Sequence, residues 1–245
     1  MDLYATVILD SVAPEATVEL NIVGADLQAL GLVQRDIKTG MKIYADFKGN
    51  ATNYDIAAIV DEGIVVYDNK TYLIGDLNAL AHVRKDTTSV SIKNKLADVL
   101  LQSNADPQTF SKSLRRHVLS YFYRDEQVPD SITNPVNLKL RGKIIQAPIL
   151  NDVFLVNVKD LDTVKFDVDF HEKERQLNAN VTAPHINYSG YELDSLVFAM
   201  DTDKDKFIFD LGFNQIKAGP FNIQKTKLSG NQSNNELSLA FEAYH

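Results

Sequence analysis

The side chains that could do chemistry in this 245-residue sequence are few and scattered. The five histidines, at positions 82, 117, 171, 185 and 245, include no pair at the i,i+4 spacing that places two metal ligands on one helix face. There is no cysteine, which excludes disulfides, thiolate metal sites and thiol nucleophiles. Gly-x-Ser-x-Gly, Walker and Gly-x-Gly-x-x-Gly motifs are also absent. The sequence therefore predicts no catalytic residues, no metal site and no cofactor.

One acidic run resembles the start of a calcium-binding loop. Asp201, Asp203 and Asp205 have the spacing with which an EF-hand loop begins. That loop needs glycine at its sixth position and glutamate at its twelfth, where this chain has Lys206 and Gly212. We interpret these aspartates as solvated charges at the tip of a hairpin.

Charge and composition narrow the class of protein. The net charge is −8 and the pI about 5.1, and no stripe of Lys and Arg is present to displace counterions from phosphates, so we expect no nucleic-acid partner. A hydrophobic fraction of 44% is typical of a folded domain. The sequence begins without a signal-peptide pattern, and no apolar run reaches the roughly 18 residues of a membrane span. We expect either a cytosolic protein or, preferably, a piece of a longer exported chain.

The pattern of predicted strands, which must position the polar and apolar side chains, is most regular in the last third of the sequence. Residues 161–183, 191–213 and 221–243 match at an offset of 30, and each has the pattern strand, polar turn, strand. Thr226 and Gly230 stand where the other units carry larger apolar side chains. Fixed-period similarity is typical of repeat architectures whose units stack, so we predict three successive hairpins.

Apolar and polar residues alternate within these strands, which gives the sheet two different faces. An apolar side chain left in water forfeits roughly 1.5–3 kcal/mol, so the apolar face must be covered by the sheet itself, a second sheet, a helix or lipid. The alternating carboxylates are then residues of a solvated face and not an acid–base pair. The alternation is clearest where Phe166, Val168 and Phe170 are interleaved with Lys165, Asp167 and Asp169.

The first hundred residues have the same character with less regularity. Turn signals at positions 48–50, 61–63, 68–70 and 84–86 separate short strands, which favours a meandering antiparallel sheet. The predicted strands are Ala16–Val23, Met41–Phe47, Tyr54–Val60, Ile64–Tyr67, Leu77–Val83, Val90–Lys93 and Ala97–Leu101.

One helix interrupts the strands. Asp106 is a good N-cap, Pro107 suits the first helical position, and apolar residues recur every four positions up to Phe122. We predict an amphipathic helix over Pro107–Tyr123 that crosses or plugs the apolar sheet face; a helix lying on a membrane surface is the alternative. The flanking stretches 124–135 and 146–148 have the composition of connections.

Together these patterns predict a mostly β protein: a repetitive antiparallel β-sheet, arranged as a β-taco (a U-shaped groove) or an elongated sandwich, with one amphipathic helix. We divide the chain into a β-sheet region over residues 1–105, the helix and linker over 106–135, and a second β-sheet region over 136–245 with a period of about 30 residues.

Short motifs in the chain resemble one known family. An alternating strand leads into Gly24-Ala-Asp-Leu-Gln-Ala-Leu-Gly-Leu32, and a second strand ends in Ile43-Tyr-Ala-Asp-Phe-Lys-Gly49. The helix pattern from Phe110 to Phe122 and the passage Ala147-Pro-Ile-Leu150 follow. These motifs are similar to those of AsmA/TamB-like proteins, the translocation and assembly module proteins, in the form found in Bacteroidota.

The resemblance implies a function in the bacterial envelope. Proteins of this group are anchored in the inner membrane, cross the periplasm as a long apolar groove thought to conduct phospholipid, and work with an outer-membrane insertase of the Omp85 type. This chain matches neither the anchor nor the characteristic C-terminal domain. The resemblance therefore implies an internal, periplasmic segment, non-enzymatic, whose partners are phospholipid acyl chains, used for lipid transport between membranes or for outer-membrane protein assembly.

The residues expected to line such a groove are the apolar positions of the three repeats. The same residues would equally form the core of a closed β-sandwich or solenoid that acts as a surface binding or adhesion module through loops such as 201–206. The predicted groove residues are Phe166, Val168, Phe170, Leu177, Val181, Leu196, Phe198, Met200, Phe207, Phe209, Leu211, Leu237, Leu239 and Phe241.

Overall fold

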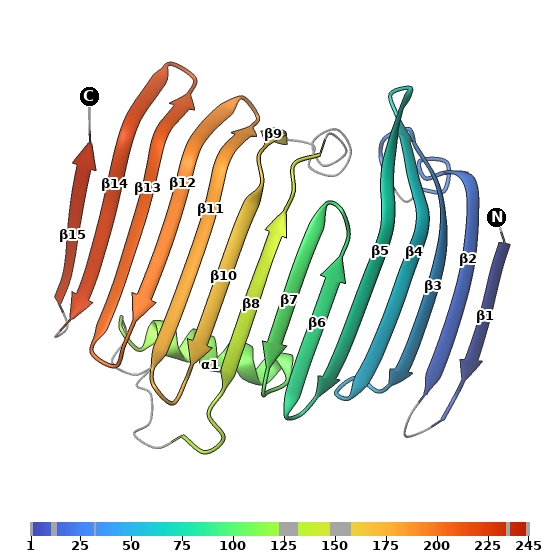
Figure 1. Ribbon diagram of the computed structural model, residues 1–245, viewed down its shortest axis with the longest axis horizontal. Helices are drawn as coiled ribbons and strands as arrows, with labels where there is room; N and C mark the ends of the chain where they lie inside the picture. The colour runs from blue at the N-terminus through green and yellow to red at the C-terminus, as the bar shows by residue number, and fades with distance from the viewer. Residues whose placement is uncertain are drawn as a thin grey trace.

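A computed structural model describes residues 2–10, 14–31, 33–122, 132–147, 158–233 and 236–243. These residues form one open antiparallel sheet of 15 strands and one helix (Figure 1). The elements are β1 (Asp2–Ile8), β2 (Glu15–Asp26), β3 (Ile37–Gly49), β4 (Tyr54–Tyr67), β5 (Lys70–Arg84), β6 (Thr87–Lys93), β7 (Ala97–Ser103), α1 (Pro107–Leu119), β8 (Asn137–Ile144), β9 (Val158–Leu161), β10 (Val164–His171), β11 (Gln176–Tyr188), β12 (Tyr191–Thr202), β13 (Lys206–Ala218), β14 (Phe221–Ser233) and β15 (Glu236–Ala243).

The order of the strands in the sheet is the order of the strands in the sequence, except that β8 pairs with β10 while the short β9 pairs with β11. Tight turns make this meander possible. Asp68 and Asn69, between β4 and β5, both have positive φ (50° and 56°), as a two-residue type I′ hairpin turn requires. Ser189 and Gly190, between β11 and β12, also both have positive φ (52° and 87°).

The structure confirms the predicted fold class, a mostly β, repetitive antiparallel sheet with one helix. The three repeats are the hairpins β10–β11, β12–β13 and β14–β15. The described residues form no second sheet that packs on the first, as an elongated sandwich would require. The boundaries proposed at residues 105 and 135 flank α1, but the sheet runs continuously from β7 to β8 across them.

One predicted turn is wrong. Residues 61–63 were expected to separate two strands, but β4 continues through them and its pairing with β5 shifts register there. Glu62 takes up the extra residue in a left-handed conformation (φ 54°), and Gly75 on β5 is also left-handed (φ 71°). This is a β-bulge, which keeps the ladder intact where a turn would end it. β1, β8 and β9 also have no counterpart among the predicted strands.

α1 lies across the sheet, behind the strands in the view of Figure 1. Asp106 caps it, accepting hydrogen bonds from the backbone N–H of Gln108 and Thr109 at 2.9 and 3.0 Å. The helix ends at Leu119, earlier than predicted; Tyr123 lies outside the described residues. Its apolar side chains pack on one sheet face, in a cluster with Ala105, Val136, Leu138, Phe170 and Leu177. Covering of the apolar face by the helix was the preferred interpretation, and the structure agrees with it.

A second cluster covers the same face beside the β4–β5 turn. Ile37, Val65 and Leu96 are buried there, and Leu27 and Val33 from the β2–β3 connection pack against them. The apolar face is thus covered locally by α1 and by this connection.

Two glycines on the apolar face accept aromatic rings from the neighbouring strand. The Phe209 ring lies over Gly230 on β14, where a Cβ atom would come within 2.0 Å of Phe209 Cε1; Phe166 lies over Gly142 in the same way, at 2.4 Å from Cζ. This explains why Gly230 replaces a larger residue in the third repeat, since the glycine leaves room for the ring.

We expect Gly230→Ala to displace the Phe209 ring and to lower the free energy of unfolding by about 1–3 kcal/mol, the usual cost of overpacking. Gly212→Ala is the matched control, because a Cβ atom there meets only the Thr226 carbonyl oxygen at 3.9 Å. Urea denaturation of both variants checks this, and equal stabilities would contradict it.

Candidate functional site

Strand register defines an apolar face and a polar face that extend across the whole sheet. Residues paired across neighbouring strands point to the same side, so pairings can be followed from β1 to β15 through every strand except β9. A first row on the apolar face contains no polar side chain: Ala5, Val18, Ala45, Ala58, Ala79, Ile92, Val99, Gly142, Phe166, Val181, Phe198, Leu211, Leu228 and Phe241.

A second row lies beside the first and is equally free of polar side chains. It starts at Val7 and ends at Leu239, two residues away from the first row on each strand. Together the two rows form an apolar band that crosses the sheet at right angles to its strands. The second row is Val7, Ala16, Phe47, Ile56, Ala81, Val90, Leu101, Leu140, Val168, Ala179, Met200, Phe209, Gly230 and Leu239.

The register places all fourteen predicted groove residues on the apolar face. They differ in accessibility. Phe170, Leu177 and Phe207 are buried, the first two within the cluster under α1. Those on β15 are open to solvent: Leu237 is 51%, Leu239 60% and Phe241 69% exposed. The remaining eight, Phe166, Val168, Val181, Leu196, Phe198, Met200, Phe209 and Leu211, are half-buried.

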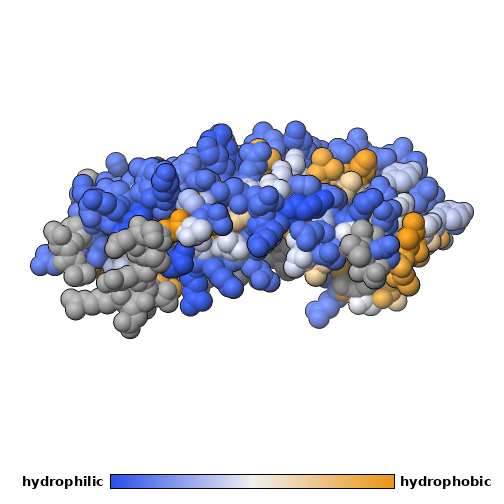
Figure 2. Space-filling model, turned by 90° about the horizontal axis from the view of Figure 1, so that it is seen from below, coloured by the Kyte–Doolittle hydropathy of each residue, from blue (hydrophilic) through white to orange (hydrophobic). Residues whose placement is uncertain are grey.

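Apolar side chains are also exposed at the opposite end of the sheet. In Figure 2, apolar surface gathers at the end of the molecule that carries β1. Leu3 and Val7 on the apolar face of β1 are each 59% exposed. The described part of the chain is therefore a large open sheet that presents apolar side chains to its surroundings.

The polar face is stabilised by ion pairs between neighbouring strands. Asp167 pairs with Arg141 at 2.8 Å, and Asp169 with Lys139 at 3.5 Å. Both carboxylates thus lie on the solvated face, as the alternation predicted, and their partners come from β8. An exposed ion pair of this kind contributes about 0–1 kcal/mol. These pairs therefore favour exposure of the polar face to water but add little to the stability of the fold.

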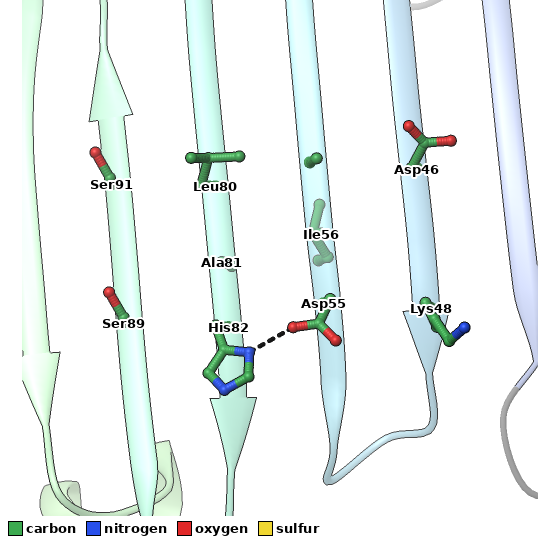
Figure 3. Close-up of a pocket in the computed structure, with 10 residues that line it drawn as sticks. Asp46, Lys48, Asp55, Ile56, Leu80, Ala81, His82, Ser89 and Ser91 are labelled. Atoms are coloured by element: carbon green, nitrogen blue, oxygen red, sulfur yellow. Dashed lines mark hydrogen bonds and ion pairs between the residues drawn. The ribbon is translucent and has the colours of Figure 1, made fainter.

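A shallow depression of about 410 Å³ on this face brings together the types of side chain found in hydrolases (Figure 3). His82 Nδ1 lies 2.5 Å from Asp55 Oδ1, and Arg84 donates to Asp55 Oδ2 at 2.6 Å. The Arg84 guanidinium, followed by His82, lowers the pKa of the Asp55 carboxyl below its ordinary value. Ser89 is the residue opposite His82 on β6.

The geometry of this depression suits an exposed ion-pair network. Figure 3 marks the contact of His82 with Asp55 and none with Ser89. Asp55, His82 and Ser89 are paired within the β4–β5–β6 ladder, near its end, and the backbone N–H groups of this ladder are engaged between strands and do not converge on a point where an oxyanion would form. The side chains of Asp55 and His82 are 43% and 48% exposed.

The polar contacts under α1 were not anticipated. Glu172, 2% exposed, accepts hydrogen bonds from Arg116 at 2.6 Å and from the backbone N–H of Val136 at 2.9 Å. His117, also 2% exposed, contacts the Thr202 hydroxyl at 2.8 Å. His117 follows Leu114 by three residues, a spacing that places it on the inner helix face, and this is the signal from which its burial could have been predicted.

Asp203 and Asp205 of the acidic run lie in the β12–β13 turn, whereas Asp201 still belongs to β12 and pairs with Ile208. The Asp203 carboxylate accepts hydrogen bonds from the backbone N–H of Asp205 and Lys206, at 2.8 and 2.9 Å. Within the described ranges, no group of three His, Asp or Glu side chains is arranged to hold a metal ion. Nor is any helix in that part of the chain long and apolar enough to cross a membrane.

In comparisons with known proteins, no family model, no curated protein sequence and no solved structure matched this chain.

Proposed function

We propose that this chain is a non-enzymatic apolar surface for phospholipid acyl chains, and that it belongs to the periplasmic part of a TamB-like envelope protein. The observation that carries the proposal is the pair of adjacent rows that cross every strand from β1 to β15 except β9 without a polar side chain. Among the described residues this apolar face is covered only locally, by α1 and by the β2–β3 connection.

The physics of the band suits an acyl chain. Each methylene removed from water contributes about 0.8 kcal/mol, wherever along the band it lies. Because no polar or charged side chain interrupts either row, an acyl chain that moves along the band meets no step at which a polar group must be desolvated. The band therefore favours movement of lipid over its retention at one position.

Further support comes from the openness of the sheet. A closed sandwich or solenoid, the alternative interpretation, would seal its apolar face with a second sheet, and the described residues form none. The inner-membrane anchor, the Omp85-type partner and the role in lipid transport or outer-membrane protein assembly rest on the resemblance of the sequence motifs, and they are part of the proposal.

Native mass spectrometry with lipid extraction, on the chain purified from a bacterial periplasm in mild detergent, tests the proposal. We expect co-purified phospholipid with the unmodified chain and its loss from the double variant Phe198→Asp/Phe209→Asp, since both side chains belong to the band. The matched control is Val197→Asp/Ile208→Asp, one residue away on the polar face, where the side chains are 50% and 37% exposed. This control should keep its lipid.

Two results would contradict the proposal. One is a chain that purifies without lipid. The other is unfolding of the Phe198→Asp/Phe209→Asp variant, monitored by circular dichroism, while the control stays folded. The latter would identify the band as an ordinary sealed core.

A further inference from the structure

The apolar band ends on one side at a third row that contains polar side chains. This row lies beside the second, two residues farther along each strand. Thr88, Ser103 and Thr202 belong to it, and they are only 2%, 8% and 1% exposed. The third row is Tyr54, Val83, Thr88, Ser103, Leu138, Phe170, Leu177, Thr202, Phe207, Gln232 and Leu237.

α1 and the residues before it satisfy the polar groups of this row. The Thr88 hydroxyl donates to the Ala105 carbonyl oxygen at 2.7 Å, and the Ala105 N–H donates to the Ser103 hydroxyl at 3.2 Å. His117 contacts the Thr202 hydroxyl at 2.8 Å. A buried hydroxyl without such a partner costs free energy, so these side chains could not face an acyl chain. The helix thus covers the row at which the band stops.

α1 runs along the band. The cluster on which it packs contains Leu138, Phe170 and Leu177, from the successive strands β8, β10 and β11. The helix therefore crosses the strands, as the band does, and lies beside the band over part of its length (Figure 1). Thirteen residues at a rise of about 1.5 Å give a wall about 20 Å long, or about four interstrand spacings.

The two sides of the helix differ in chemistry. Arg116 reaches Glu172, in the turn after β10, and so points towards the ends of the strands. Leu114 and Val118 are each two residues from Arg116, a rotation of about 200° around the helix axis, so they face the band. Both are half-buried, and they pack against the same cluster as Val168 of the second row. The side of α1 next to the band is therefore apolar.

Aromatic contacts extend this wall to β13. The rings of Tyr121 and Phe122 lie 5.5 and 5.1 Å from the ring of Phe207. The Phe207 ring in turn lies 6.1 Å from that of Phe209 in the second row. At the other end of the helix, Leu101 on β7 packs against the cluster under α1. The second row is thus flanked by α1 and its C-terminal residues from β7 to β13.

A corner of this kind removes more of an acyl chain from water than the open sheet does. On the open band the chain contacts protein on one side only. Beside α1 it contacts the sheet beneath it and the helix at its side. Because hydrophobic stabilisation grows with the apolar area removed from water, the chain is held more tightly in the corner. The wall limits sideways movement and leaves movement along the band free.

We propose that an acyl chain lies in the corner between the second row and α1, with Leu114 and Val118 as its side wall. This inference rests on the proposed function and identifies β7–β13 as the part of the band that binds lipid most tightly. It gives α1 a role in lipid binding in addition to covering the third row.

Photo-cross-linking on the unmodified chain tests the position of the acyl chain. The probe is a phosphatidylcholine that carries a diazirine in its acyl chain, and the adducts are mapped by mass spectrometry of peptides. We expect adducts on Leu114 and Val118 and on the second row between β7 and β12. Lys112 and Leu119, four residues before and three after Arg116, lie on the other side of the helix and should carry none.

A matched pair of truncations tests the contribution of the wall. Leu114→Ala and Leu119→Ala remove the same atoms from opposite sides of one helix. The apparent dissociation constant for phosphatidylcholine, from native mass spectrometry, should rise about fivefold in Leu114→Ala and stay unchanged in Leu119→Ala. Hydrogen exchange of the α1 amides shows whether the helix stays docked in each variant. If Leu114→Ala releases the helix, the cross-linking result decides.

The outcomes separate this inference from the proposed function. Adducts on the band without any on α1 would overturn the corner and leave the proposed function intact. A complete lack of adducts would contradict both. Equal dissociation constants in Leu114→Ala and Leu119→Ala, with α1 protected in both, would show that the helix makes no contact with the acyl chain.

Discussion

Replacement of Arg116 with methionine is expected to weaken the docking of α1 on the sheet by about 3 kcal/mol. The Glu172 side chain is only 3% exposed, and Arg116 supplies the positive charge beside its carboxylate at 2.6 Å. Removal of one partner leaves a buried charge with the Val136 N–H as its remaining donor. Methionine keeps an apolar stem of similar reach, so the loss reports the charge and not the packing.

Hydrogen exchange of the α1 amides measures this effect, because opening of the helix exposes them without requiring the whole sheet to unfold. The double variant Arg116→Met/Glu172→Gln is the informative comparison. Since it removes both charges, it should recover a large part of the lost protection, and the two substitutions should be strongly non-additive. Additive effects, or unchanged protection in Arg116→Met, would show that the pair does not hold the helix.

Acidification is expected to loosen the same helix through His117. Burial lowers the pKa of His117 from 6.5 to about 4, opposed by the Glu172 carboxylate and reinforced by Arg175. Between these two values the unfolded chain binds a proton that the folded chain excludes, so stability falls as the pH drops from 6.5 towards 4. At about 1.4 kcal/mol per pH unit, the loss reaches about 3 kcal/mol at pH 4.

Other groups also titrate in this range, so the comparison must be made against a variant that lacks only this titration. His117→Gln keeps a neutral hydrogen-bonding group beside Thr202. The stability of the unmodified chain minus that of His117→Gln should decrease by about 3 kcal/mol from pH 7 to pH 4, in urea denaturation series. A difference that stays constant with pH would mean that His117 is protonated equally in the folded and unfolded states.

Alternation within strands was sufficient to predict the two faces of the sheet. Side chains at i and i+2 point to the same side whatever the neighbouring strand is, so the face of Phe198 or Asp167 follows from its own segment. The N-terminus of α1 was predictable for the same reason, because Asp106 and Pro107 act on the adjacent backbone.

Features that depend on a partner strand could not be predicted. Whether residues 61–63 form a turn or a bulge is decided by β5, which supplies a pairing on both sides of them. The role of Gly230 depends on the Phe209 ring opposite. Glu172 lies in a polar turn whose composition predicts exposure to solvent. It is buried because α1 lies over it and Arg116 of that helix contacts its carboxylate. The continuity of the apolar band is likewise a property of register between strands.

Because nearly every strand pairs with its neighbours in the sequence, the number of strands sets the width of the sheet. One more hairpin of about 30 residues would widen it by roughly 10 Å, two interstrand spacings, and would leave the contacts of every other hairpin unchanged. Duplication or deletion of such a unit would therefore change the width of the sheet by a fixed step. Since hairpins come in pairs of strands, each change would also preserve the relative direction of the two outer strands.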